Sequence, residues 1–163
     1  CIEAGVTITG AFDDAVTCMI GGVNVTDNYK REILTHWNIE EDLSILISIP
    51  EEKIYTGELN VDVFKNIRTL SSRAVTLALN GLIWDAMIIN GFIIASALNI
   101  DYRPMLTVLK KNILACGVSG KGPAIVAVTR PAYENEIERE FRNFGKTLKT
   151  KPNNKMAEVQ VLK

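Results

Sequence analysis

Residues 113–129 read ILACGVSGKGPAIVAVT, two apolar runs separated by a glycine-rich stretch. Short apolar runs bounded by turn residues are typical of buried strands. The pattern therefore predicts one strand from Ile113 to Gly117 and another from Ala124 to Thr129, joined by a loop over residues 118–123.

The segments that precede this hairpin show both strand and helix periods. Apolar positions recur at spacings of three and four from Val63 to Leu77, the period of an amphipathic helix. Residues 28–41 are polar and mixed, and we expect a connection in which Trp37 anchors a loop. The other elements expected here are a helix within residues 5–20 that ends at Gly21-Gly22, strands over 23–26 and 43–49, a central helix over 82–98, and a short helix from Pro104 to Lys111.

The segments that follow the hairpin predict a helix and two short strands. The helix runs from Tyr133 to Phe144, with Ile137, Phe141 and Phe144 facing inward, and Gly145 ends it. The strands cover 146–149 and 158–162, on either side of a turn at Pro152-Asn153-Asn154. Strands alternating with helices in this order predict an α+β fold of ferredoxin-like type, with helices packed on one face of an antiparallel sheet.

Composition excludes several classes of partner. The chain has 163 residues, 47% of them apolar, which is enough for a sizeable core. Its 18 basic and 19 acidic residues leave a formal net charge of −1, so no overall field would hold nucleic acid or an anionic membrane. The apolar run over 82–98 is interrupted by Asp85 and Asn90, which favours a buried helix over a membrane span.

The three cysteines predict a reduced protein without a metal site. Cys1, Cys18 and Cys116 are widely spaced and form no CxxC or Cys/His cluster of the kind that zinc requires. A cytoplasmic protein fits this pattern best. Cys18 and Cys116 lie among apolar neighbours, so we expect both to be small core residues.

The loop over residues 117–123 suggests anion binding. Three glycines and a serine lie within six residues, and their backbone N–H groups can turn toward a common phosphate. An ordinary hairpin turn is the alternative on spacing alone. The loop is neither a Walker A sequence nor a GxGxxG fingerprint, because no Lys-Ser/Thr pair closes it and it joins two strands.

The run GVSGKGPAIVAV from Gly117 to Val128 resembles the third conserved motif of the GHMP superfamily of small-molecule kinases, a Gly-x-Ser-Gly-x-Gly-Pro stretch that leads into an apolar strand. In that family this loop lies beside the nucleotide phosphates and the substrate. The resemblance places such a role on Ser119, Gly120, Lys121 and Gly122. Lys121 stands where small residues are more common, so a phosphate contact by its side chain is a separate hypothesis.

A second segment, AGVTITGAFDDAVTCMIGGVNVTDN over residues 4–28, is similar to the archaeal type of shikimate kinase. In the superfamily this region supplies an aspartate near the hydroxyl that is phosphorylated. The resemblance assigns that role to Asp13, with Asp14 as the alternative. Without the family, adjacent carboxylates near a helix are read as one capping group and one solvated group.

The same resemblance implies a part that these residues do not contain. GHMP kinases hold ATP and contribute to the Mg²⁺ site with a loop resembling Pro-x-x-x-Gly-Leu-x-Ser-Ser-Ala, and no such run occurs in residues 1–163. We therefore expect a missing amino-terminal half. Residues 1–40 would be the remainder of the amino-terminal ATP and substrate domain, and 41–163 the carboxy-terminal ferredoxin-like domain.

The predicted reaction is ATP-dependent phosphorylation of the 3-hydroxyl of shikimate. A guanidinium is the natural partner of the shikimate carboxylate, and Arg103 stands where homoserine kinases resemble this chain with a Tyr-Arg pair. Arg68 is the second candidate. Both also fit solvated surface arginines. The alternatives are homoserine kinase, another GHMP small-molecule kinase, and a ferredoxin-like binding module without catalysis.

Other polar residues have structural interpretations. His36, the single histidine, has no Ser, Cys or Asp constellation near it in sequence and is expected on the surface. The charges from Glu134 to Arg142 are spaced for local pairing along a solvated helix face.

Overall fold

The computed structural model describes residues 11–51 and 63–158. The chain divides into two compact units. Residues 1–41 and 152–163 form the first, which we call the hairpin unit, and residues 42–151 form the second, the sheet unit. Most of the expected strand over 158–162 lies outside the described residues.

The hairpin unit contains one helix and a two-stranded antiparallel sheet. Helix α1 (Phe12–Ile20) leads into β1 (Val23–Asp27), which pairs with β2 (Glu32–Trp37). The side chain of Asp27 accepts hydrogen bonds from the N–H groups of Tyr29 and Lys30, both at 3.0 Å, and so closes the turn between the strands. The interpretation of residues 28–41 as a connection was wrong, because Trp37 lies in a strand opposite Val23.

The segment over residues 152–158 packs against the corner between α1 and β1. The N–H of Gly22 donates to the carbonyl oxygen of Asn153 at 2.8 Å. Gly21 has a φ of +71°, and a Cβ there would lie 2.7 Å from the same oxygen. Glycine is therefore required at this corner both by its backbone conformation and by the close approach.

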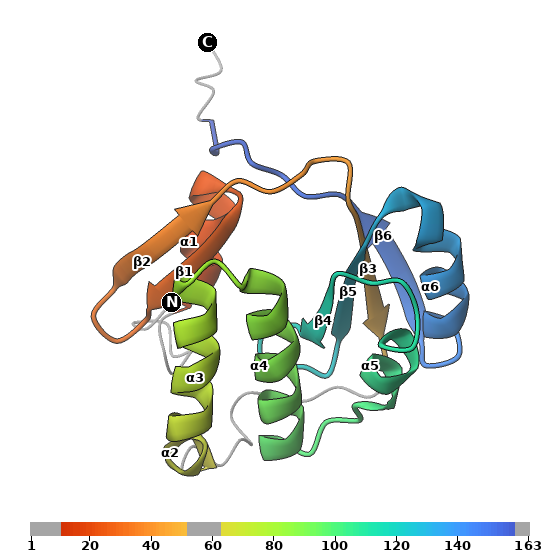
Figure 1. Ribbon diagram of the computed structural model, residues 1–163, viewed down its shortest axis with the longest axis horizontal. Coiled ribbons are helices and arrows are strands. Elements are labelled where there is room, and N and C mark those ends of the chain that lie inside the picture. The colour runs from red at the N-terminus through yellow and green to blue at the C-terminus, as the bar shows by residue number, and fades with distance from the viewer. Residues whose placement is uncertain (1–10, 52–62, 159–163) are drawn as a thin grey trace. The chain divides into compact units, whose positions relative to one another are not determined.

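The sheet unit is built on four antiparallel strands in the order β4-β5-β3-β6 (Figure 1). They are β3 (Ser44–Ile49), β4 (Ala115–Val118), β5 (Ile125–Thr129) and β6 (Lys146–Thr150). With helices between β3 and β4 and between β5 and β6, this is the strand order of a ferredoxin-like βαββαβ fold. The predicted α+β class and sheet are confirmed.

The helices of this unit agree with the expected elements, with shifted boundaries. They are α2 (Val63–Asn66), α3 (Arg68–Leu79), α4 (Ile83–Ala97), α5 (Arg103–Val108) and α6 (Glu134–Phe141), with the 3-10 turn η2 (Pro131–Tyr133) before α6. The helix predicted from the pattern between Val63 and Leu77 is interrupted at Ile67. Helix α5 ends three residues before Lys111.

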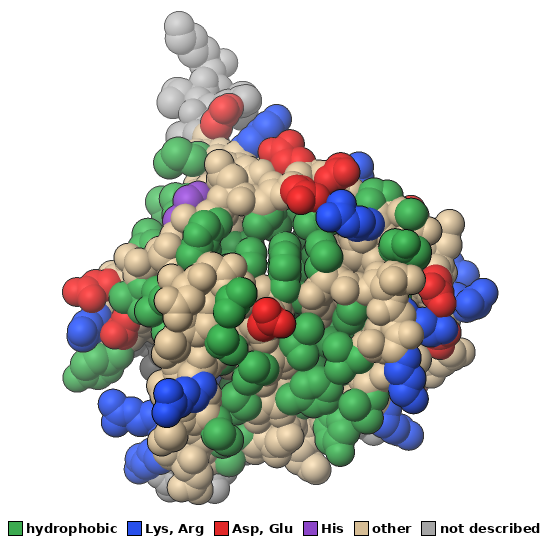
Figure 2. Space-filling view, in the orientation of Figure 1, with side chains coloured by type: hydrophobic (Ala, Val, Ile, Leu, Met, Phe, Trp, Pro, Cys, Tyr) green, Lys and Arg blue, Asp and Glu red, His purple; other side chains and the backbone are tan. Residues whose placement is uncertain are grey.

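The main core lies where α4, α5 and α6 meet one face of the sheet. It includes Leu46 of β3, Cys116 of β4, Met105 of α5 and Phe141 of α6, all 0% exposed. A smaller cluster packs the half-buried Trp84 of α4 against Val128 of β5. In the space-filling view, apolar side chains also gather on the surface over α4 (Figure 2). The helix was expected to be buried, but part of its apolar surface is exposed.

Two expectations for individual side chains were wrong. Cys18 is exposed on α1, whereas Cys116 is buried in the core as predicted. The acidic residues of α6 do not pair only within the helix, because Glu136 and Glu140 both contact the Nζ of Lys111, at 3.0 and 3.3 Å. These contacts raise the pKa of Lys111, the hydrogen bond from Glu136 being the largest cause. They tie α6 to the segment after α5.

Candidate functional site

The loop between β4 and β5 carries the predicted phosphate-binding residues. The N–H of Ser119 donates to the carbonyl of Ala124 at 2.9 Å, and the N–H of Gly122 donates to the carbonyl of Ser119 at 2.8 Å. Gly120 has a φ of +56° and Gly122 of +75°, a region that glycine adopts without strain. The N–H groups of Gly120 and Lys121 have no partner among the described residues. Two of these four amides are thus used in the turn and two can meet an anion.

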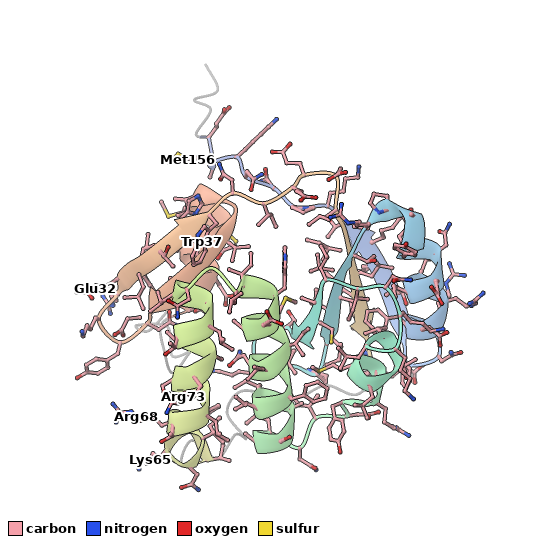
Figure 3. The ribbon with its side chains drawn as sticks, in the orientation of Figure 1. Glu32, Trp37, Lys65, Arg68, Arg73 and Met156 are labelled. Atoms are coloured by element: carbon pink, nitrogen blue, oxygen red, sulfur yellow. The ribbon has the colours of Figure 1, made fainter. Side chains whose placement is uncertain are left out.

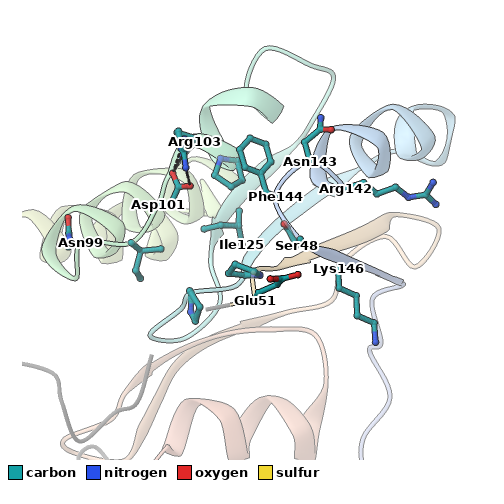
Figure 4. Close-up of a pocket in the computed structure, with 15 residues that line it drawn as sticks. Ser48, Glu51, Asn99, Asp101, Arg103, Ile125, Arg142, Asn143, Phe144 and Lys146 are labelled. Atoms are coloured by element: carbon teal, nitrogen blue, oxygen red, sulfur yellow. Dashed lines mark hydrogen bonds and ion pairs between the residues drawn. The ribbon is translucent and has the colours of Figure 1, made fainter. Parts of the chain in front are cut away.

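A cavity of about 710 Å³ lies beside this loop, within the range of small-molecule sites (Figure 4). Pro123, which ends the loop, lines it together with Arg103 at the start of α5. Ser48 comes from β3 and Phe144 from the turn between α6 and β6. The cavity therefore brings one end of the glycine loop and the predicted carboxylate-binding arginine to the same space.

The Arg103 guanidinium is held by one neighbour. Its Nε donates to Oδ1 and Oδ2 of Asp101 at 2.9 and 3.0 Å, and its Nη2 donates to Oδ2 at 2.7 Å. This hydrogen bonding lowers the pKa of Asp101 and raises the pKa of Arg103. Since the guanidinium has five donors, one edge stays on Asp101 while the Nη1 end can receive a second carboxylate. Arg103 remains 77% exposed.

Arg68 does not line this cavity. It is the first residue of α3, is exposed, and points away from α4 (Figure 3). Of the two interpretations given for Arg68, the position of its side chain fits that of a solvated surface arginine. His36 is likewise exposed as expected, and its Nδ1 lies 2.9 Å from Oδ1 of Asn24.

Asp13 and Asp14 lie in the first turn of α1 and are both exposed. Neither side chain caps the helix. Oδ1 of Asp13 accepts a hydrogen bond from Nδ2 of Asn28 at 2.7 Å. The two carboxylates thus differ, because Asp13 is held by a partner and Asp14 has none among the described residues.

The described residues show neither a metal-binding cluster nor a helix that could span a membrane. They contain no group of three or more His, Cys, Asp or Glu side chains able to hold a metal ion. No helix in residues 11–51 or 63–158 combines the length and apolar character needed to cross a membrane.

Sequence reasoning missed the side chains that complete these sites. Asn28 is the last residue of the segment 4–28 that resembles shikimate kinases. Its place in that segment, just after β1, could have marked it as a candidate. Arg142, Phe144 and Lys146 line the cavity from the end of α6 and the start of β6. No sequence pattern brings that segment beside α5, because the strand order of the sheet does so.

Nearly all of this chain is similar in sequence to proteins named shikimate kinase. No family model matches the chain. A shikimate kinase of Methanosarcina acetivorans is 35% identical over 158 residues, covering 95% of this chain and 53% of that protein. One from Pyrococcus abyssi is 38% identical over 148 residues, covering 91% and 53%. The chain spans about half the length of the curated relatives that it matches.

A solved structure supports the fold. The crystal structure of homoserine kinase from Cytophaga hutchinsonii matches 86% of this chain and 51% of its own, with a TM-score of 0.62 and 16% identity. At that identity the likeness shows the fold alone. The sequence matches confirm the resemblance expected from the sequence: nearly all of this chain is similar to about half of each of these shikimate kinases.

Proposed function

We propose that this chain is part of a kinase that transfers the γ-phosphoryl group of ATP to the 3-hydroxyl of shikimate. The observation that carries the proposal is the similarity of 91–95% of the chain to proteins named shikimate kinase. Arg103 lines a cavity that Pro123, at the end of the loop, also lines, and its guanidinium suits an anionic substrate.

In this proposal, Asp13 orients the attacking hydroxyl and accepts its proton, with Asp14 as the alternative. The hydroxyl oxygen bonds to the γ-phosphorus, and the bond to the leaving ADP oxygen breaks. The backbone amides of Gly120 and Lys121 stabilise developing charge on phosphate oxygens. Arg103 binds the carboxylate through its Nη1 end.

ATP and Mg²⁺ require more than the described residues offer. Two unpaired amides cannot neutralise a triphosphate. Magnesium in kinases is commonly held by one or two carboxylates together with the phosphates, so it would enter with the nucleotide. We propose that a Gly/Ser-rich loop outside these 163 residues completes the nucleotide site. A cytoplasmic location remains part of the proposal.

The test is ADP release by the protein expressed from its intact gene, measured with shikimate and homoserine in parallel. We expect turnover with shikimate, and a loss of about 100-fold or more in kcat for Asp13→Asn. Homoserine kinase is the second candidate, because the solved structure of similar fold bears that name. Preference for homoserine would replace the proposed substrate. No turnover with either, in a protein that still binds small anions, would favour the non-catalytic module.

A further inference from the structure

Asp13 lies at the end of a chain of side-chain hydrogen bonds. The hydroxyl of Thr26 donates to Oδ1 of Asn28 at 2.8 Å, and Nδ2 of Asn28 donates to Oδ1 of Asp13 at 2.7 Å. Thr26 belongs to β1, Asn28 follows that strand, and Asp13 is in α1. The link therefore joins the catalytic candidate to the strand beside its helix.

The chemistry of the three groups fixes the direction of this chain. An ionised carboxylate can only accept, so the amide must present its NH₂ to Asp13. The amide oxygen then needs a donor, which the Thr26 hydroxyl provides. Each hydrogen bond also polarises the next and strengthens it. Asn28 is half-buried and so is its hydrogen bond with Thr26, whereas its hydrogen bond with Asp13 is exposed.

We propose that Asn28 is a positioning residue for Asp13 in the phosphoryl-transfer reaction, an inference that rests on the proposed function. Asn28 occupies Oδ1 and holds the carboxylate in one rotamer. Oδ2 has no partner among the described residues and is available to the substrate hydroxyl. A base held in this way loses less rotational freedom when the reacting geometry forms.

The primary experiment is steady-state kinetics with Asn28→Ala in the protein expressed from its intact gene. We expect kcat to fall about 10- to 100-fold, the range for a hydrogen bond to a charged group. The KM values for shikimate and ATP should stay within about twofold, because a positioning residue acts through Asp13 and not by binding either substrate. Thr26→Val, which keeps shape but removes the hydroxyl, should lower kcat about three- to tenfold.

Asn24 offers a matched control in the same strand. Its Nδ2 donates to the carbonyl of Gly21 at 2.9 Å, at the opposite end of α1 from Asp13. Asn24→Ala removes a comparable contact between helix and strand and should leave kcat unchanged within about twofold. If Asn24→Ala and Asn28→Ala lower kcat and the melting temperature equally, Asn28 has only a structural role and the inference fails.

A double-mutant cycle separates action through Asp13 from any other route. In an Asp13→Asn background, adding Asn28→Ala should lower kcat by no more than about twofold. In an Asp14→Asn background, it should keep its full effect. Full additivity with Asp13→Asn, or coupling to Asp14 alone, would overturn the inference.

The design also distinguishes this inference from the proposed function. If wild type turns over shikimate and Asp13→Asn does not, while Asn28→Ala matches wild type, the positioning role alone is wrong. If wild type shows no turnover of shikimate, the proposed function fails and the positioning role falls with it.

Discussion

Gly91 of α4 and Gly117 of β4 meet backbone to backbone, such that a Cβ on Gly91 would lie 2.6 Å from the Cα of Gly117. The same Cβ would lie 2.8 Å from Cε of Met105. Non-bonded carbon atoms do not approach this closely. The helix therefore approaches the strand only because position 91 lacks a side chain. The approach matters for function because Gly117 is two residues before Ser119, the first of the proposed phosphate-binding residues.

Gly91→Ala should push α4 away from β4. We expect the free energy of unfolding to fall by about 1–3 kcal/mol, the cost of overpacking a tight core. Urea denaturation measures it. Asn90→Ala, at the exposed neighbouring position on α4, is the control and should change stability by less than about 0.5 kcal/mol. Equal stability of the two variants would contradict the packing of α4 against β4.

Arg103→Lys should weaken binding of the acidic acceptor. Lysine keeps the positive charge but cannot hold Asp101 along one edge and a carboxylate at the other. We expect the KM for shikimate to rise about tenfold or more, with the KM for ATP unchanged. Arg68→Lys serves as the control outside the cavity. A comparable rise in both variants would argue against a carboxylate site at Arg103.

The two described cysteines should differ in reactivity. Cys18 is exposed, whereas burial raises the pKa of the Cys116 thiol to about 11. At pH 8, iodoacetamide should modify Cys18 rapidly and Cys116 only after unfolding in urea, because the thiolate is the reactive form. Peptide mass mapping reads out each site. Rapid modification of Cys116 in the native protein would show that the core is not packed as described.

The same pKa shift predicts a loss of stability at alkaline pH. The pKa of the thiol has its ordinary value of 9.0 in the unfolded chain, whereas burial raises it to about 11 in the folded protein. Between those values the unfolded state binds fewer protons, so stability falls as pH rises. Thermal melts of wild type and Cys116→Ala from pH 8 to 10.5 check the sign. The variant should lose less stability over this range, and parallel curves would contradict the prediction.

A protein limited to residues 1–163 should show no kinase turnover. The described loop offers two unpaired amides, and the proposed nucleotide loop is not in this sequence. ADP release above background in the presence of shikimate and Mg-ATP would refute this. As a control, calorimetry measures the binding of shikimate alone to the same protein. Its affinity is compared with that of the Arg103→Ala variant.

Periodicity predicted the elements that have one buried face. Strand β3 alternates buried and half-buried residues, and its apolar run was recognised from the sequence. Strand β2 was missed because most of its residues, including Glu32 and His36, are exposed, so no alternation marks it. Cys18 was misplaced for a related reason: apolar sequence neighbours do not decide which face of a helix a residue occupies.

The candidate site was predictable where a motif is local and not where it depends on topology. The glycine loop and Arg103 each lie within a few residues of a recognisable pattern. Their common cavity depends on the ends of β3, α5 and α6 coming together, which follows from the strand order. The Asn28–Asp13 hydrogen bond joins positions 15 residues apart, from the residue after β1 to the first turn of α1, beyond any local rule.

The packing of residues 152–158 against Gly21 and Gly22 has a consequence for biosynthesis. The ribosome makes the first part of the hairpin unit, then the whole sheet unit, and only afterwards the segment that fills the corner between α1 and β1. The nascent chain must therefore keep that corner open until translation has passed Ala157, whose N–H binds the carbonyl of Met19. Of these two units, the one whose synthesis begins first is thus the last to be completed.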